Sequence, residues 1–315
     1  MLGRRPPMTS PEPMSPAEEA AGAELLWPFA LLVLGACAMG ISPIFVRLAS
    51  PEVGPFASAF WRVALALPLL YLWARHEGPE TGATPVRGTA LLAGAAFAGD
   101  LVFWHLSIMA TTVANSTFFA TTSPLFVVLG TWLILRRPVA WRTLGGLAFC
   151  LAGGGALVAE SLSVAPGRLK GDVFGVVTAA FFATYLLLMA RARQWGGAAR
   201  VTFVSSMATA AILLVVAILL DRDRFWAGRA ETWAALLGLA FVSQVAGQGL
   251  LAVALGRLPT VFSSLVIFLE AVFAAAAGWM VLGEALSLVQ YAGGALILAG
   301  IVLARPTRGA REGAG

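Results

Sequence analysis

The sequence has few charged residues and few cysteines, and each shortage excludes a class of protein. Charged side chains make up 12% of the 315 residues, about half of the ~25% that is typical of soluble chains. A water-soluble globule of this size could not cover its surface with so few. The apolar composition equally excludes a disordered or collagen-like chain. The two cysteines, Cys37 and Cys150, lie inside apolar runs and are expected to pack rather than to form a disulfide.

Signatures of enzymes and of metal sites are also missing from the sequence. It has two histidines, His76 and His105, and no HExxH pattern, so we expect no metal site and no cofactor. The glycines at 153–155 lie in an apolar run without a following GK[ST], which excludes a phosphate-binding loop. The net charge of +5 comes from arginines at segment ends and needs no nucleic-acid partner. The sequence therefore predicts a protein that is not an enzyme.

What the sequence has is a succession of long apolar segments. Hydrophobic residues make up 59% of it and the mean hydropathy is +0.85. A helix that spans a bilayer needs about 20 mostly apolar residues, because lipid offers no partner to free backbone groups. The expected fold class is an all-α membrane protein with ten transmembrane helices, at residues 26–46, 56–73, 89–109, 115–135, 141–158, 173–190, 201–220, 233–255, 261–282 and 286–304.

The basic residues predict how the chain is oriented in the membrane. With the N-terminus inside, the cytoplasmic connections carry 14 Lys and Arg residues and the outer connections carry 6. Cytoplasmic connections are the ones that carry the excess of basic residues. We therefore expect a multi-pass protein of the inner (plasma) membrane with both termini in the cytoplasm. Arg4 and Arg5 lie too far from the first apolar segment for a cleaved signal peptide.

The chain repeats itself with an offset of 147 residues. Seven positions in the fourth and fifth predicted spans match the ninth and tenth, namely Ser116 with Ser263, Phe126 with Phe273, Trp132 with Trp279, Leu135 with Leu282, Gly146 with Gly293, Ala152 with Ala299 and Gly153 with Gly300. Each half holds five spans, an odd number, so the second half enters the membrane from the opposite side. The sequence therefore predicts two inverted five-helix repeats, an arrangement that places a substrate site near the midplane. Duplication without a transport role is the alternative.

The repeat sets the expected organisation of the chain. Residues 1–24, rich in Pro, Ser and Glu, form a disordered cytoplasmic tail, and residues 306–315 form a second cytoplasmic tail. The first repeat covers residues 25–160 and the second covers residues 173–305, with an outer connection at residues 161–172.

Several motifs resemble a known family. Asp100–His105 (DLVFWH), Thr111–Asn115 (TTVAN) and Ser123–Phe126 (SPLF) resemble the third and fourth helices of the EamA domain, which belongs to the drug/metabolite transporter superfamily. Leu269–Phe273, Gly278–Trp279 and Leu282–Glu284 resemble the matching part of its second copy. The resemblance covers about residues 26–306 and implies a ten-helix exporter of small metabolites with a central cavity.

The chain departs from the family pattern at two places. Arg136–Arg137 stands where the family often has Gly-Glu, so any role of that glutamate is supported only at Glu284. Ala271 stands where the family often has proline, which removes one expected kink.

Ionisable residues inside the predicted spans are the first candidates for function. Arg62, Asp100 and Glu270 lie there, as does His105. A charge at bilayer depth costs about 2.5–3.5 kcal/mol on insertion scales, so these side chains should face the protein interior or a wet cavity. Glu270 could bind a proton or an ammonium group, and Arg62 could hold a substrate carboxylate through two hydrogen bonds. Structural pairing of Arg62 with Asp100 or Glu270 is the alternative.

Polar and aromatic residues on symmetry-related helices complete the predicted site. Phe97, Leu101 and His105 share a face of the third span, and the repeat maps this face onto Gln244, Gln248 and Ala252. Hydrogen bonds between helices are the alternative role of the two glutamines. The predicted substrate-binding residues are Trp104, His105, Asn115, Phe119, Thr122, Tyr185, Gln244, Gln248, Ser263 and Glu270. Structural or coupling candidates are Arg62, Asp100, Pro124 and Glu284. Pro124 removes a backbone hydrogen bond, and its alternative role is simply to kink its helix.

Together these patterns predict a secondary transporter that works by alternating access in the lipid bilayer. The expected cargo is a small polar or amphipathic metabolite of the amino-acid or amine type, and proton or other ion coupling is possible. The outward direction follows from the resemblance alone. The alternatives are a passive solute channel, a membrane scaffold without transport, and an intramembrane enzyme or lipid-handling protein.

Overall fold

The fold is known from a computed structural model, which describes residues 16–78, 85–159, 169–282 and 287–306. The described residues form helices joined by short turns, with no strand among them. The elements in chain order are α1 (Pro16–Gly40), α2 (Ser42–Val53), α3 (Pro55–Ala64), α4 (Leu67–His76), α5 (Pro85–Ala110), α6 (Val113–Thr121), α7 (Ser123–Leu133), α8 (Trp141–Val158), α9 (Leu169–Arg193), α10 (Ala198–Leu220), η2 (Arg222–Arg224), α11 (Ala230–Gly238), η3 (Leu239–Gln248), α12 (Gly249–Leu255), α13 (Thr260–Val266), α14 (Leu269–Leu282) and α15 (Leu288–Leu303).

The predicted membrane spans coincide with helical segments. Eight helical stretches of the described chain are long and apolar enough to cross a bilayer. The regions predicted as the ninth and tenth spans form shorter apolar helices, Thr260–Ala276 and Leu288–Leu303. The described residues thus confirm the expected all-α membrane class, with eight long candidate spans and two shorter apolar helices. Several spans are built from two helices in line, such as α1 with α2 and α6 with α7.

The helix α1 begins earlier than predicted. We expected residues 1–24 to be a disordered tail, but α1 begins at Pro16, so its first turns occupy residues 16–24. The physical reason is local. Proline fits the first turn of a helix, and the following PAEEAAGAE segment consists mostly of strong helix formers with acidic residues near the N-terminus. Residues 1–15 lie outside the described part of the chain.

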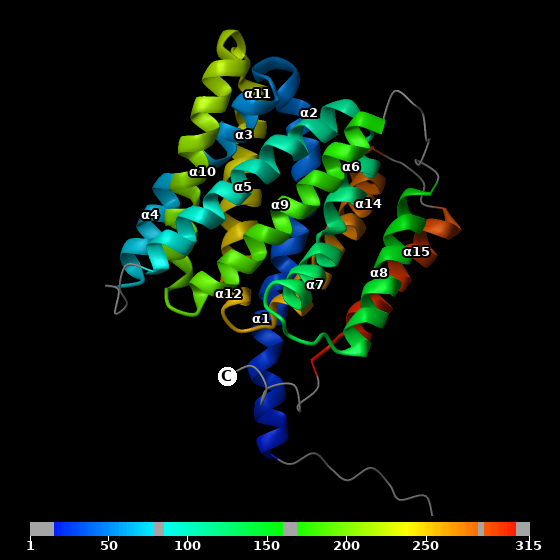
Figure 1. The fold of residues 1–315 in the computed structure, drawn as a ribbon. Coiled ribbons are helices and arrows are strands. Elements are labelled where there is room, and N and C mark those ends of the chain that lie inside the picture. The colour runs from blue at the N-terminus through cyan, green and yellow to red at the C-terminus, as the bar shows by residue number, and fades with distance from the viewer. Residues whose placement is uncertain (1–15, 79–84, 160–168, 283–286, 307–315) are drawn as a thin grey trace, which may run out of the picture.

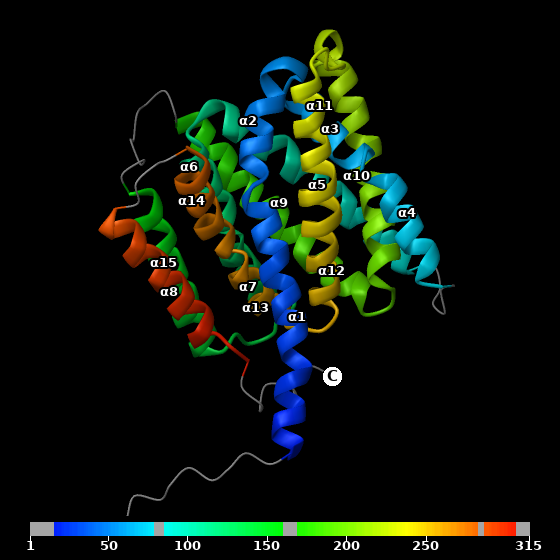
Figure 2. The same ribbon diagram turned by 180° about the vertical axis from the view of Figure 1, so that it is seen from behind.

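The helices form one bundle with a peripheral pair. Figures 1 and 2 show α8 and α15 side by side at one edge of the bundle, with α4 and α10 at the opposite edge. The helix α5 packs along α9, and α1 runs beside η3, α12 and α14. The start of α1 and the end of α15 lie at the same end of the bundle (Figure 1).

Glycines hold α8 and α15 close together. A Cβ atom added to Gly146 would lie 2.5 Å from the carbonyl oxygen of Gly300, and one added to Gly153 would lie 2.5 Å from that of Gly293. These are the glycines that the 147-residue offset relates to one another, so the two contacts repeat each other across the helix pair. Cys150 lies between them, and its Sγ donates a weak hydrogen bond to the carbonyl oxygen of Ile297 at 3.7 Å. The expectation that Cys150 is a packing residue is consistent with this position.

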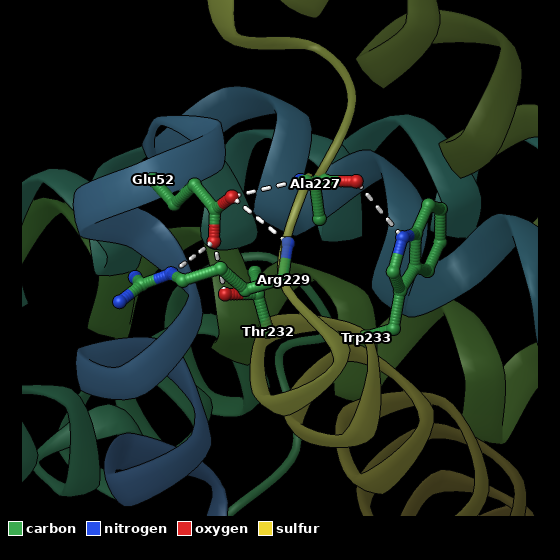
Figure 3. A network of polar contacts seen from close by, with 6 residues as sticks. Glu52, Ala227, Arg229, Thr232 and Trp233 are labelled. Carbon is green, nitrogen blue, oxygen red and sulfur yellow. Dashed lines mark hydrogen bonds and ion pairs between the residues drawn. The ribbon is translucent and has the colours of Figure 1, made fainter.

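Acidic side chains from distant segments cap the N-termini of helices. Glu52, at the end of α2, accepts hydrogen bonds from the backbone nitrogens of Gly228 (2.7 Å) and Arg229 (3.2 Å) just before α11. It also accepts from the guanidinium of Arg229 (3.0 Å) and the hydroxyl of Thr232 (Figure 3). Glu77 caps α10 in the same way through the backbone nitrogens of Ala199 and Arg200. A carboxylate at a helix N-terminus satisfies unpaired N–H groups and interacts favourably with the helix dipole.

A third cap gives a testable contribution to stability. Asp221, which is 5% exposed, accepts hydrogen bonds from the backbone nitrogens of Phe56 (2.6 Å) and Ala57 (3.0 Å) at the start of α3. We expect Asp221→Ala to lower the free energy of unfolding by about 1–2 kcal/mol, since removal of a capping acceptor costs that much. Thermal unfolding of the purified protein in detergent measures the loss.

The neighbouring aspartate provides the control for that measurement. Asp223 is exposed, so Asp223→Ala should leave the midpoint unchanged, and Asp221→Asn, which keeps an acceptor oxygen, should lose less than Asp221→Ala. Equal midpoints for Asp221→Ala and Asp223→Ala would mean that the cap contributes nothing.

Candidate functional site

A small cavity with charged, polar and apolar side chains in its lining lies at the centre of the bundle. Its volume is about 50 Å³, and residues from both halves of the chain line it. The charged lining residues are Arg62, Asp100 and Glu270. The polar ones are Ser42, Thr121, Thr178 and Gln248, and the apolar ones are Met39, Phe97, Leu101, Trp104, Ala120, Phe182 and Ile267.

Arg62 brings a cation into this cavity. It lies on α3 and is 4% exposed. Its Nε donates a hydrogen bond to Oε1 of Gln244 at 3.3 Å. Its guanidinium carbon lies 5.8 Å from the ring centroid of Phe97 and 5.6 Å from that of Trp104, within cation–π distance. The aromatic rings and Gln244 therefore hold the guanidinium while its terminal nitrogens stay available to a ligand.

Two carboxyl groups share the cavity with Arg62 without contacting it. Asp100 lies on α5 and Glu270 lies in the first turn of α14. Arg62 makes no ion pair within 4.0 Å with either of them. Oε1 of Glu270 is buried and has no hydrogen-bond partner. A buried acceptor without a partner costs free energy, so this oxygen is positioned for a ligand or a water. The direct pairing considered for Arg62 in the sequence is not the observed geometry.

The two glutamines of the eighth predicted span lie differently. Gln248 lines the cavity; its Nε2 donates to Sδ of Met39 at 3.3 Å, and its buried Oε1 has no partner. Gln244 bridges Arg62 and Ser206, since its Nε2 donates to the serine hydroxyl at 3.3 Å. Both glutamines lie in η3, a π-helix. Such wide turns within helices occur frequently at functional sites.

His105 and Tyr185, predicted to bind substrate, lie outside the cavity lining. His105 is fully buried, with Nδ1 2.8 Å from the carbonyl oxygen of Leu101 and Nε2 without a partner. The histidine side chain thus turns back along its own helix. Tyr185 is stacked on Phe97 at a centroid distance of 4.7 Å, so it supports the ring that faces Arg62. Trp104, by contrast, lines the cavity.

The predicted residues of α6 lie beside the cavity rather than in it. Nδ2 of Asn115 donates to Asp172 at 3.3 Å, and the hydroxyl of Thr122 donates to the carbonyl oxygen of Phe119 at 2.6 Å. The ring of Phe119 packs at a centroid distance of 5.4 Å from that of Phe118. The neighbouring Thr121 does reach the lining.

Ser263 and Pro124 are two further residues that the sequence singled out. The serine hydroxyls at the symmetry-related positions Ser116 and Ser263 are both buried without a partner. Pro124 is in the first turn of α7, and the backbone N–H of Thr122 donates to the carbonyl oxygen of Ala120, which the proline leaves without its usual partner. Glu284 lies outside the described residues.

Met39, Ser42, Thr178 and Phe182 line the cavity, although sequence reasoning did not single them out. Ser42 and Thr178 carried a usable signal, because a hydroxyl in an apolar span needs a partner. The Ser42 hydroxyl donates to that of Ser243 at 2.6 Å, and the Thr178 hydroxyl donates to the backbone oxygen of Asp100 at 3.4 Å. Met39 and Phe182 cannot be told from ordinary core residues. Among the described residues, no group of three His, Cys, Asp or Glu side chains could hold a metal ion.

The fold and the cavity are those of a multi-pass membrane protein with charged groups around a central cavity, and comparisons with known proteins agree. The profile of the EamA-like transporter family matches residues 26–158 and again residues 169–305. The chain belongs to this family, and it is a membrane transporter of the drug/metabolite type.

Relatives and a solved structure match over most of the chain. Two proteins of Archaeoglobus fulgidus, each named "Uncharacterized transporter", are 25% identical over 279 residues and 26% identical over 278 residues. The first alignment covers 82% of this chain and 91% of the relative, and the second covers 87% and 95%. A crystal structure with a TM-score of 0.71 covers 90% of this chain and 97% of its own, at 18% identity. It shares the fold.

Proposed function

We propose that this protein is a secondary transporter that exports a small polar or amphipathic metabolite, of the amino-acid or amine type, by alternating access through the central cavity. The observation that carries this proposal is the lining of that cavity. Arg62, Asp100 and Glu270 come from both family-matched segments and face one space without neutralising one another in pairs. A carboxylate on Arg62 and an ammonium group near Glu270 would complete the unpaired groups.

The proposed topology is ten spans in two inverted five-helix repeats, residues 25–160 and 173–305. We place the protein in the inner (plasma) membrane with both termini in the cytoplasm. Three observations support it. The family profile matches the two halves separately. The described ends of the chain lie at one end of the bundle (Figure 1). The reciprocal glycine contacts of α8 and α15 are those that a pseudo-two-fold axis would produce.

The small size of the cavity supports alternating access over a passive pore. At about 50 Å³, it has room for a few water molecules, whereas sites for small ligands measure roughly 300–1,000 Å³. A cargo molecule therefore needs the helices around the cavity to separate. Such a change is what rocking of the two halves supplies. A passive channel would need a continuous wet path instead.

Coupling to a proton is the proposed source of energy for uphill transport. Glu270 is the candidate carrier, because its buried oxygen has no partner and because it shares the cavity with the proposed cargo site. A carboxyl group that holds a proton in one state and a cargo ammonium in another would link the two movements.

The test is counterflow in proteoliposomes with a library of amino acids and amines, with and without a pH gradient. A carrier gives saturable uptake and counterflow, whereas a channel gives flux that does not saturate. A scaffold gives no flux, and an intramembrane enzyme releases a chemically altered product. Counterflow absent for the whole library, from folded and inserted protein, would contradict the proposal.

The coupling role predicts a specific loss in one variant. In Glu270→Gln, we expect the dependence of transport on a pH gradient to disappear, because the amide cannot exchange a proton. The matched control is Glu231→Gln, since Glu231 is an exposed carboxylate on α11, and it should transport like the wild type. A pH dependence that persists in folded, inserted Glu270→Gln would exclude this coupling role.

A further inference from the structure

A second hollow lies on the outside of the bundle, between α7 and α9, and it is apolar. Its volume is about 230 Å³, and its lining includes Phe126, Leu129, Leu133, Ala183 and Leu187. Leu129 is 40% exposed and Leu133 is 60% exposed, so the hollow opens on the outer surface. Both helices belong to candidate membrane spans. The surface that contains this groove therefore faces the bilayer.

The groove exists because small residues face each other across it. Gly130 on α7 has no side chain, and a Cβ atom added there would lie 2.8 Å from Cδ1 of Leu187. Ala180 and Ala183 form the wall on α9. Thr184 is the polar residue of the lining, and its hydroxyl donates to the backbone oxygen of Ala180 at 2.9 Å. The groove therefore presents an apolar surface and suits a hydrocarbon occupant.

One end of the groove carries arginines. On α9, the groove residues Ala183 and Leu187 are followed one turn later by Arg191, on the same helix face. After α7, Arg136 and Arg137 follow the groove residue Ile134, with Leu135 between them. All three arginines are exposed. The two helices end at the same end of the groove, so the three charges gather beside it.

The backbone after α7 keeps its arginines near the groove. Arg136 has a φ of 51°, in the left-handed region that reverses the chain direction at a helix end. The backbone nitrogen of Arg137 donates to the carbonyl oxygen of Thr131 at 3.1 Å, so the chain folds back over the end of α7. A non-glycine residue in this conformation costs free energy and is worth an explanation.

We propose that the groove binds an acyl chain of an anionic phospholipid, whose phosphate is held by Arg136, Arg137 and Arg191. The bilayer supplies the acyl chains, and clusters of basic residues at the membrane surface attract anionic headgroups. Arginine matches a phosphate through paired hydrogen bonds. A second copy of the chain fits less well, because two copies oriented alike in a membrane would bring their arginine clusters together across a two-fold axis.

The headgroup contacts are tested by lipid binding to the purified full-length protein in detergent. Native mass spectrometry with dioleoyl-phosphatidylglycerol and dioleoyl-phosphatidylcholine compares lipids with the same chains and different charge. We expect preferential binding of phosphatidylglycerol. In Arg136→Gln with Arg137→Gln, each lost arginine should weaken this binding about fivefold, whereas phosphatidylcholine binding should not change. The control, Arg75→Gln with Arg222→Gln, removes two exposed arginines away from the groove. Equal losses in the two double variants would overturn the headgroup site.

The acyl-chain contact has a separate test. Thr184 is exposed, so Thr184→Phe fills the groove without crowding the core and should weaken the binding of both lipids. Val215, 58% exposed on α10, gives the control Val215→Phe, which should bind both lipids normally. Thr184→Leu repeats the test if Thr184→Phe folds poorly. Unchanged lipid binding in the folded Thr184 variants, or a loss of dimers rather than of lipid, would overturn the proposal. None of these outcomes depends on the transported substrate.

Discussion

Gly293→Leu is expected to force α15 away from α8 and to lower the stability of the whole protein. A Cβ atom at this position would lie 2.6 Å from the carbonyl oxygen of Gly153 and 2.9 Å from the backbone nitrogen of Leu157. Both are backbone atoms of α8, which cannot move without displacing that helix. Overpacking of this kind costs about 1–3 kcal/mol, and contact with backbone places Gly293→Leu at the upper end. Thermal unfolding in detergent, together with the yield of inserted protein, measures the effect.

The adjacent glycine gives a matched control on the same helix. A Cβ atom at Gly294 would have no atom within 4 Å, so Gly294→Leu adds the same side chain on the lipid-facing side and should leave the unfolding midpoint at the wild-type value. A midpoint for Gly293→Leu equal to that of Gly294→Leu would show that the close helix contact does not stabilise the fold.

The helix pair also shows what a sequence pattern can predict. α8 begins at Trp141 and ends at Val158, as the apolar pattern predicts. The glycines that the 147-residue offset relates, Gly146 with Gly293 and Gly153 with Gly300, lie where the two helices come close together. Both features can be found in the sequence because they depend on local properties, namely apolar length and the absence of a side chain.

Breaks between helices, other than the one before Pro124, were not predicted, because they depend on contacts between distant segments. Gly54 has a φ of 78° between α2 and α3, and the cap of α3 comes from Asp221. The ninth predicted span is interrupted at Ile267 and Phe268, between α13 and α14. We had expected the absence of a proline at Ala271 to remove a kink there. Backbone geometry of this kind follows from tertiary packing, which hydrophobic periodicity does not encode.

Charge in the sequence indicates which residues line the cavity better than the expected helix face does. Arg62, Asp100 and Glu270 reach the cavity because a charged group in a span has few other places to lie. On α5, the cavity face contains Phe97, Asp100, Leu101 and Trp104, a spacing of three and four residues. His105, which the sequence predicts to share a face with Phe97 and Leu101, lies outside the lining. A rotation of the helix by less than the turn of one residue, about 100°, accounts for the difference.

Arg62→Gln is expected to reduce transport of a cargo that carries a carboxylate, with little effect on the corresponding amine. The physical reason is the charge of the cavity. Arg62 is its only cation among the lining residues of the described chain, and aromatic rings and Gln244 hold it in place. A hydrogen bond to a charged group contributes about 1.5–3 kcal/mol, which corresponds to roughly 10- to 100-fold in affinity. The measurement is counterflow at subsaturating concentration with an amino acid and with its decarboxylated amine.

Comparison of the two cargoes separates a binding role of Arg62 from a structural one. If the arginine only stabilises the fold by offsetting Asp100 and Glu270, Arg62→Gln should reduce transport of the amino acid and the amine equally, and it should lower the unfolding midpoint. Arg62→Lys keeps the charge and loses the planar, two-pronged donor geometry, so it should recover fold stability more fully than amino-acid transport. A wild-type ratio of amino-acid to amine transport in folded Arg62→Gln would exclude the carboxylate contact. A reduced ratio with a normal midpoint would assign the substrate carboxylate to this guanidinium.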